Sequence, residues 1–230
     1  VLLKQNLNVI VSGIEEGRAI FANTIKYIKA TLASNFGNFY AIGFVSLFIN
    51  FLPLLPMQIL LVNLLSDFPF LGIATDTVDP EDIRLPQRYS VKEILRFATL
   101  LGVVSTADDL LFFIIFYRFG PEILQTNWFI GSILTELIVL FSIRTRHLFI
   151  RAIRPSGILV VLTSLAAIVT ITIPFFTWGR KAFSFVRPTA PHLLIILGLV
   201  LGYFVASEII KLWYYHNPHL TSKAKHSSSH

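Results

Sequence analysis

The strongest constraint on the fold is a series of long apolar stretches with few charged residues. They lie at residues 32–52, 57–74, 95–117, 127–143, 157–178 and 192–214. An α-helix rises 1.5 Å per residue, so about 20 apolar residues cross the hydrocarbon core of a bilayer. We therefore predict an all-α membrane protein, a bundle of about six transmembrane helices.

Composition agrees with a membrane environment. Hydrophobic residues make up 54% of the 230 residues, charged residues only 14%, and the mean hydropathy is +0.70. Soluble domains carry about 25% charged residues. The chain has no cysteine, which excludes disulfides and thiolate metal sites, so a bound metal ion must be held by oxygen or imidazole ligands.

The net charge of +6 reflects orientation in the membrane rather than a nucleic-acid partner. Basic residues near helix ends mark the cytoplasmic side. Four basic clusters fall on one side of the predicted bundle, which predicts that both termini lie in the cytoplasm: Lys26 and Lys29; Arg84, Arg88, Lys92 and Arg96; Arg144, Arg146, Arg151 and Arg154; Lys211, Lys223 and Lys225. Arg180, Lys181 and Arg187 fall on the other side and do not fit this rule.

The two ends of the chain differ from its apolar middle. Residues 1–30 begin with a strand-like apolar piece and continue into a charged amphipathic helix around Glu15, Glu16, Arg18 and Lys26. This pattern predicts a short remnant of a soluble α/β domain and a helical stalk that leads into the transmembrane region, residues 31–215. Residues 216–230 form a polar tail that we expect to be disordered.

The stretch LLVNLLSDFPFLG, residues 60–72, carries Asn63, Ser66 and Asp67 inside an apolar run. At about 100° per residue the three side chains share one helix face. A carboxylate at the bilayer centre costs about 2.5–3.5 kcal/mol, so it is rarely kept without a use. Together with the amide and the hydroxyl it offers oxygen ligands for a hard cation. Pro69 leaves a carbonyl near Leu65 without its helical donor, which adds a further ligand candidate.

The SNFGN motif places Asn35 and Asn38 on one face of the preceding helix. The turn at residues 53–56, Pro-Leu-Leu-Pro, makes the two helices antiparallel neighbours, so we expect these amides to face the polar residues of 60–72. Gly37 would allow a close approach between the two backbones. The alternative is that all these groups are interhelical hydrogen-bond donors and acceptors. We favour a cation site because such packing does not require a carboxylate.

Three further acidic residues lie within predicted spans. Glu136 is either a third-helix ligand, a proton-exchanging acid, or a protonated acid hydrogen-bonded to a neighbouring helix, and the sequence leaves these alternatives open. Asp108 and Asp109 point about 100° apart, and we favour a packing role for them.

The remaining polar and aromatic signals have simpler explanations. Glu208 and Lys211 are spaced as an interfacial ion pair. The six histidines show no metal-ligand spacing. Trp128, Trp178 and Trp213 fall at the ends of spans, as expected of anchors at the membrane surface.

Five segments together resemble the C-terminal third of a P-type ion-pumping ATPase, especially its bacterial magnesium-transporting branch. They are GIEEGRAIF, SNFGN, the Pro-Leu-Leu-Pro turn, LLVNLLSDFP and DTVDPEDIRLPQR. The resemblance covers residues 1–215 and implies the tail of the phosphorylation domain followed by membrane helices five to ten. It also implies that the protein lies in a bacterial or archaeal plasma membrane. It implies that Asn35, Asn38, Asn63, Ser66 and Asp67 stand where such pumps bind their ion. Calcium pumps usually have an acid where this chain has Asn38, which favours one divalent ion, Mg²⁺, over a calcium-type pair.

The family's phosphorylated aspartate in its DKTG motif and its nucleotide-binding domain do not occur in these residues. The leading hypothesis is therefore the Mg²⁺-transporting membrane domain of a pump, which uses ATP only through a missing N-terminal half. The alternative is a stand-alone, non-catalytic membrane protein, a remnant or a regulator that pairs with an intact pump. A small channel or carrier is weaker because no repeat or pore-lining series is visible. Oxygen ligands by themselves suit Mg²⁺, Ca²⁺ and Mn²⁺.

Overall fold

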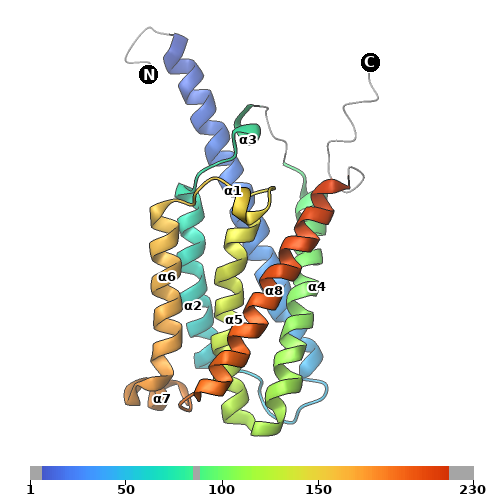
Figure 1. Ribbon diagram of the computed structural model, residues 1–230, viewed down its shortest axis with the longest axis vertical. Helices are drawn as coiled ribbons and strands as arrows, with labels where there is room; N and C mark the ends of the chain where they lie inside the picture. Colours follow the sequence, from blue (N-terminus) through green and yellow to red (C-terminus); the bar gives the residue numbers. More distant parts are fainter. Residues whose placement is uncertain (1–6, 85–88, 218–230) are drawn as a thin grey trace.

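The computed structural model describes residues 7–84 and 89–217, and within them every regular element is a helix. The long helices are α1 (Leu7–Val45), α2 (Pro56–Leu71), α4 (Val91–Phe116), α5 (Pro121–Ile143), α6 (Gly157–Thr172) and α8 (Ala190–His216). Short helices α3 (Pro80–Arg84) and α7 (Thr177–Phe183) lie at opposite ends of the bundle (Figure 1). Four single 3₁₀ turns complete it: η1 (Gly72–Thr75), η2 (Tyr117–Phe119), η3 (Phe149–Arg151) and η4 (Ile173–Phe175). The predicted all-α membrane bundle is confirmed.

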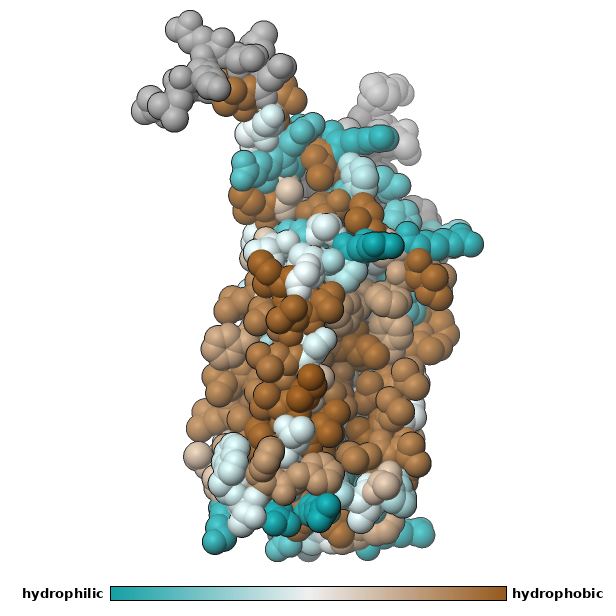
Figure 2. All heavy atoms as spheres, turned by 60° about the vertical axis from the view of Figure 1, so that its left-hand side comes forward, coloured by the Kyte–Doolittle hydropathy of each residue, from teal (hydrophilic) through white to brown (hydrophobic). Residues whose placement is uncertain are grey.

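Five helical segments of the described chain are long and apolar enough to cross a membrane, at residues 56–75, 91–119, 121–143, 157–175 and 190–216. They match five of the six predicted spans. The sixth prediction, residues 32–52, coincides with the second half of α1, which ends at Val45. Asn35 and Asn38 lower the hydropathy of this half of the helix. Figure 2 shows the resulting apolar band between two polar ends.

The 39-residue helix α1 joins the predicted stalk to the bundle without a break. The strand-like start predicted for the chain is helical from Leu7 onward, and its first six residues lie outside the described residues. The predicted tail lies outside them from residue 218.

Helix α1 packs most extensively on α4, not on α2. A Cβ added to Gly37 would lie 2.5 Å from the Cβ of Ser105, and one added to Gly102 would lie 2.9 Å from the Cβ of Phe36. Gly37 therefore does allow a close approach between backbones, but the prediction that α2 is the partner was wrong. Helices α1 and α2 are antiparallel and touch at few places, because α2 packs mainly against α5 and α6.

Helix α5 occupies the middle of the bundle and contacts α1, α2, α4, α6 and α8 (Figure 1). Its side chains are buried nearly all around, including Phe129, Ile130 and Ile133. Trp128 is also buried, at 1% exposed, and its ring is tilted by 58° against that of Phe113, with 4.5 Å between the centroids. The prediction that Trp128 anchors the membrane surface was therefore wrong, whereas Trp178 and Trp213 are more than half exposed.

Candidate cation site

Glu136 lies in the interior of the bundle, 6% exposed, on the central helix α5. The Nδ2 of Asn38 on α1 donates a hydrogen bond of 2.6 Å to Glu136 Oε1. Ser132, one turn before Glu136, donates from Oγ to Asn38 Oδ1 at 3.3 Å. Ser34 on α1 and Ser66 on α2 also lie beside the Glu136 carboxyl. Three helices therefore contribute oxygen atoms to one buried position.

The three polar residues predicted on α2 do not share one environment. Ser66 is buried, and its Oγ donates to the backbone carbonyl of Val62 at 3.0 Å. Asn63 and Asp67 are exposed on the surface of the described bundle. The Asp67 carboxyl is nevertheless close enough to Glu136 to interact with it electrostatically. The carboxyl groups of Asp67 on α2 and Glu136 on α5 therefore lie near each other.

The structure connects the predicted residues differently from the expected two-helix cage. Asn35 is exposed, and within residues 7–84 and 89–217 no hydrogen bond joins Asn35 or Asn38 to Asn63, Ser66 or Asp67. Helix α5 supplies the link instead, through Glu136. Of the six predicted site residues, Asn38 and Glu136 are bonded, Ser66 lies beside them, and the other three lie on the surface.

Two serines of this cluster were not predicted. Ser34 and Ser132 each precede a predicted residue by four positions, Asn38 and Glu136 respectively. Residues four apart lie on the same helix face. This spacing was present in the sequence and would have identified both serines.

The donor set consists of carboxylate, amide and hydroxyl oxygens, which are the ligands that Mg²⁺ and Ca²⁺ take in proteins. Over the described residues, no group of three or more histidine and acidic side chains is arranged to hold a metal ion. A cation here would therefore be held by two carboxylates at most, with neutral oxygens completing its shell.

The other interior acids lie side by side on α4. Asp109 Oδ1 accepts a hydrogen bond of 2.7 Å from Trp128 Nε1, and both Asp108 and Asp109 are buried. This bond joins α4 to α5, and the Asp109 carboxyl is close enough to that of Glu136 to interact with it electrostatically. It is compatible with the packing role that the sequence favours.

The predicted ion pair between Glu208 and Lys211 is confirmed, with 2.5 Å between Lys211 Nζ and Glu208 Oε1. The lysine is fully buried and also donates to the backbone carbonyls of Ser142 and His147 at 3.1 and 2.8 Å. The pair fastens the C-terminal end of α8 to the end of α5.

A second polar cluster lies where the stalk meets the loops after η1 and α5. Arg144, at the end of α5, binds both carboxylate oxygens of Asp76, at 2.7 and 3.2 Å, and both residues are buried. Asn23 of α1 donates to the backbone carbonyl of Asp76 at 2.7 Å, and Lys26 donates to that of Thr77 at 3.1 Å. Burial lowers the pKa of Lys26 below its ordinary value of 10.5, and the nearby carboxylate of Asp76 partly offsets this effect. The cluster ties the stalk to the loops after α2 and α5.

Comparison with known proteins agrees with this architecture. A family model described as "Cation transporting ATPase, C-terminus" matches residues 51–213. The chain is 34% identical over 223 residues to "Magnesium-transporting ATPase, P-type 1" of Salmonella typhimurium and 35% identical over 224 residues to the protein of the same name in Escherichia coli strain K12. Both alignments cover 93% of this chain and 24% of the relative. A "Calcium-transporting ATPase" of Bacillus subtilis strain 168 is 34% identical over 157 residues, which cover 63% of this chain and 17% of that protein.

The chain thus spans about a quarter of the length of the magnesium-transporting relatives, and the match lies in the region that the family model describes as C-terminal. Its apolar helices are those of an integral membrane protein. The chain belongs to the P-type cation-transporting ATPases and corresponds to the C-terminal transmembrane region of that family.

Proposed function

We propose that this chain is the membrane transport domain of a Mg²⁺-translocating P-type pump, in which ATP is used by the remaining part of a longer protein. Residues 1–30 would then be the end of the phosphorylation domain and the stalk, with both termini in the cytoplasm. The magnesium-transporting relatives support Mg²⁺ as the cargo.

The observation that carries the proposal is the hydrogen bond between Asn38 and Glu136. It brings the SNFGN motif of α1 against the single buried acid of the central helix, beside Ser66 of α2. When a cation arrives, Glu136 and Asp67 supply negative charge from two sides, while Asn38 Oδ1 and the serine hydroxyls replace water. Asn35 and Asn63 are the remaining proposed ligands. They are exposed in this chain, on a surface that the rest of the pump would cover.

Substitution of the two carboxyls in the full natural protein tests this function. Asp67→Asn and Glu136→Gln keep size but remove charge, so we expect each variant to lose at least tenfold in Mg²⁺ uptake. Glu122→Gln, on an exposed residue in the first turn of the same helix α5, is the control and should transport normally.

Uptake of Mg²⁺, Ca²⁺ and Mn²⁺ by the unmodified protein, measured in parallel, tests the cargo. Uptake by Asp67→Asn equal to that of the unmodified protein would remove Asp67 from the site. Faster uptake of Ca²⁺ than of Mg²⁺ would overturn the assignment of the ion.

A further inference from the structure

The segment around α7 carries an unusual set of exposed aromatic side chains at one end of the bundle. Phe175, Phe176 and Trp178 are 37%, 53% and 60% exposed. In Figure 1, α7 lies at the end opposite α3 and the N-terminal part of α1. Aromatic side chains, tryptophan above all, gather where lipid headgroups meet the hydrocarbon core. This segment therefore lies at the depth of the headgroups.

The same segment holds the three basic residues that the orientation rule leaves unexplained, Arg180, Lys181 and Arg187. No salt bridge in the described part of the chain joins any of them to a carboxylate. Arg187 lies over the ring of Phe175, 5.6 Å from its centroid. At the opposite end, by contrast, Arg144 and Arg146 are paired with Asp76 and Asp82. The positive charge near α7 has no protein counter-ion among these residues.

A surface hollow of about 410 Å³ lies beside Arg187, between the end of η4 and the start of α8. Its wall combines apolar surface with a guanidinium and a hydroxyl group, and the lining residues are Phe175, Arg187, Pro188, Thr189, Ala190 and Leu193. This combination matches the boundary between a charged headgroup and the first carbons of an acyl chain.

We propose that this hollow binds the headgroup of an anionic phospholipid of the phosphatidylglycerol type. The planar guanidinium of Arg187 would bind the phosphate through two hydrogen bonds, a geometry in which arginine is stronger than lysine. Arg180 and Lys181 would add charge from α7, and Phe175 and Leu193 would cover the start of an acyl chain. A bound anionic lipid supplies the counter-ion that the described residues lack.

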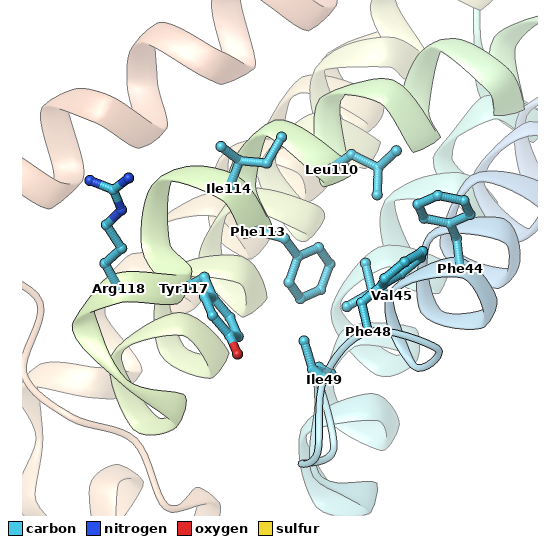
Figure 3. A pocket seen from close by; sticks show the side chains of 9 residues that line it. All are labelled: Phe44, Val45, Phe48, Ile49, Leu110, Phe113, Ile114, Tyr117 and Arg118. Carbon is cyan, nitrogen blue, oxygen red and sulfur yellow. The ribbon is translucent and has the colours of Figure 1, made fainter.

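A second hollow at the same end lacks these features. It measures about 420 Å³ and lies between α4 and the end of α1, lined almost entirely by apolar side chains. Figure 3 shows that the guanidinium of Arg118 points away from Phe44 and Phe48. Arg118 is therefore a suitable control, a basic residue at the same end of the bundle outside the proposed lipid site.

Native mass spectrometry of the full natural protein in detergent, titrated with phosphatidylglycerol or phosphatidylcholine, tests the proposal. The unmodified protein should bind phosphatidylglycerol more tightly. A basic residue at an anionic membrane surface contributes about 1 kcal/mol, so each charge removed should weaken this binding about fivefold. The double variant Arg180→Gln, Arg187→Gln should therefore bind about 25-fold more weakly, while Arg118→Gln should bind as the unmodified protein does.

Three results would overturn the site. They are an unchanged preference for phosphatidylglycerol in the double variant, an equal loss in Arg118→Gln, and displacement of the lipid by inorganic phosphate at the same concentration. Arg187→Lys separates charge from geometry, because it should bind more weakly than the unmodified protein but more tightly than Arg187→Gln. The thermal unfolding midpoint of each variant in phosphatidylcholine confirms that it is folded.

Discussion

Individual small residues decide which helices touch. At Gly37 the absence of a side chain lets α1 approach α4 so closely that a Cβ would lie 2.5 Å from the Cβ of Ser105. On the same helix, Gly43 has no neighbouring atom within 4 Å of the position of an added Cβ. Asn38 is one residue beyond Gly37, so the same contact fixes how far the Asn38 amide reaches toward Glu136.

Gly37→Ala should destabilise the protein by about 1–3 kcal/mol, because the added methyl group overfills a packed contact. Gly43→Ala is the matched control and should cost nothing measurable. The change in thermal unfolding midpoint in detergent checks both. Ser105→Gly should restore stability to Gly37→Ala, since it removes the clashing atoms, and failure of this rescue would place the strain elsewhere.

Among the elements, the loop after η1 is held by a network of hydrogen bonds around Asp76 and Arg144. The pair between Arg144 and Asp76 is buried, and Asp76 Oδ1 also accepts a hydrogen bond from the backbone N–H of Ser156 at 2.9 Å. Arg144 further donates to the carbonyl of Ile153 at 2.6 Å and to the hydroxyl of Thr77 at 2.6 Å. One guanidinium therefore connects α5, the loop after η1 and the loop that precedes α6.

Arg144→Met should lower the free energy of unfolding by about 3–5 kcal/mol, because it leaves the carboxylate of Asp76 buried without its counter-ion. Arg146→Met removes a pair whose arginine is 32% exposed, and it should cost no more than about 1 kcal/mol. Equal losses in the two variants would contradict the assignment of Arg144 as the main connection. Thermal unfolding in detergent is again the measurement.

Lys26, in the stalk, makes the free energy of unfolding depend on pH. Burial lowers its pKa in the folded state, while in the unfolded chain it titrates near 10.5. The cost of burying the charge is therefore fully present below the folded pKa and is relieved as pH rises from that value toward 10.5. Relative to Lys26→Met, the unmodified protein should gain stability over this range. A difference in stability between the two proteins that stays constant across pH would refute the lowered pKa of Lys26. Lys92→Met, which replaces an exposed lysine, is the control.

At the scale of the whole molecule, the bundle exposes polar groups on one of its helices, and the relatives that it matches are about four times as long as this chain. Asn63 and Asp67 are exposed on α2 although they lie within a candidate span, and the chain covers about 24% of the magnesium-transporting relatives. A polar stripe facing lipid would be costly. Under the proposed function, we expect further membrane helices of the pump to cover this stripe and to form an aqueous path to the ion.

Thiol labelling tests this arrangement, because the chain itself has no cysteine. In the full protein, with any other cysteine replaced, Asn63→Cys should react with a water-soluble maleimide, and Mg²⁺ should slow the reaction. Leu64→Cys, an exposed neighbour on the same helix, should react slowly whether or not Mg²⁺ is present. Equal labelling of the two positions would place Asn63 outside an ion path.

Local pattern was sufficient for most of the secondary structure. Apolar runs located five spans, and the spacing of Glu208 and Lys211 indicated their ion pair. The prediction that α1 packs on α2 was wrong, because a short connection makes two helices antiparallel but does not decide which of their side chains meet. The prediction that Trp128 lies at the membrane surface was wrong for a related reason. Its position near a predicted helix end gives no information about the neighbouring helices that bury it.

The sequence by itself determined a helical membrane protein with oxygen-bearing side chains at defined positions, because hydrogen bonding within lipid leaves the backbone few alternatives to the helix. Only the tertiary structure decided that Asn38 meets Glu136 on α5, and that Gly37 faces α4. The physical reason is that contacts between helices depend on the fit of side chains far apart in the chain, and helical periodicity carries no information about that fit.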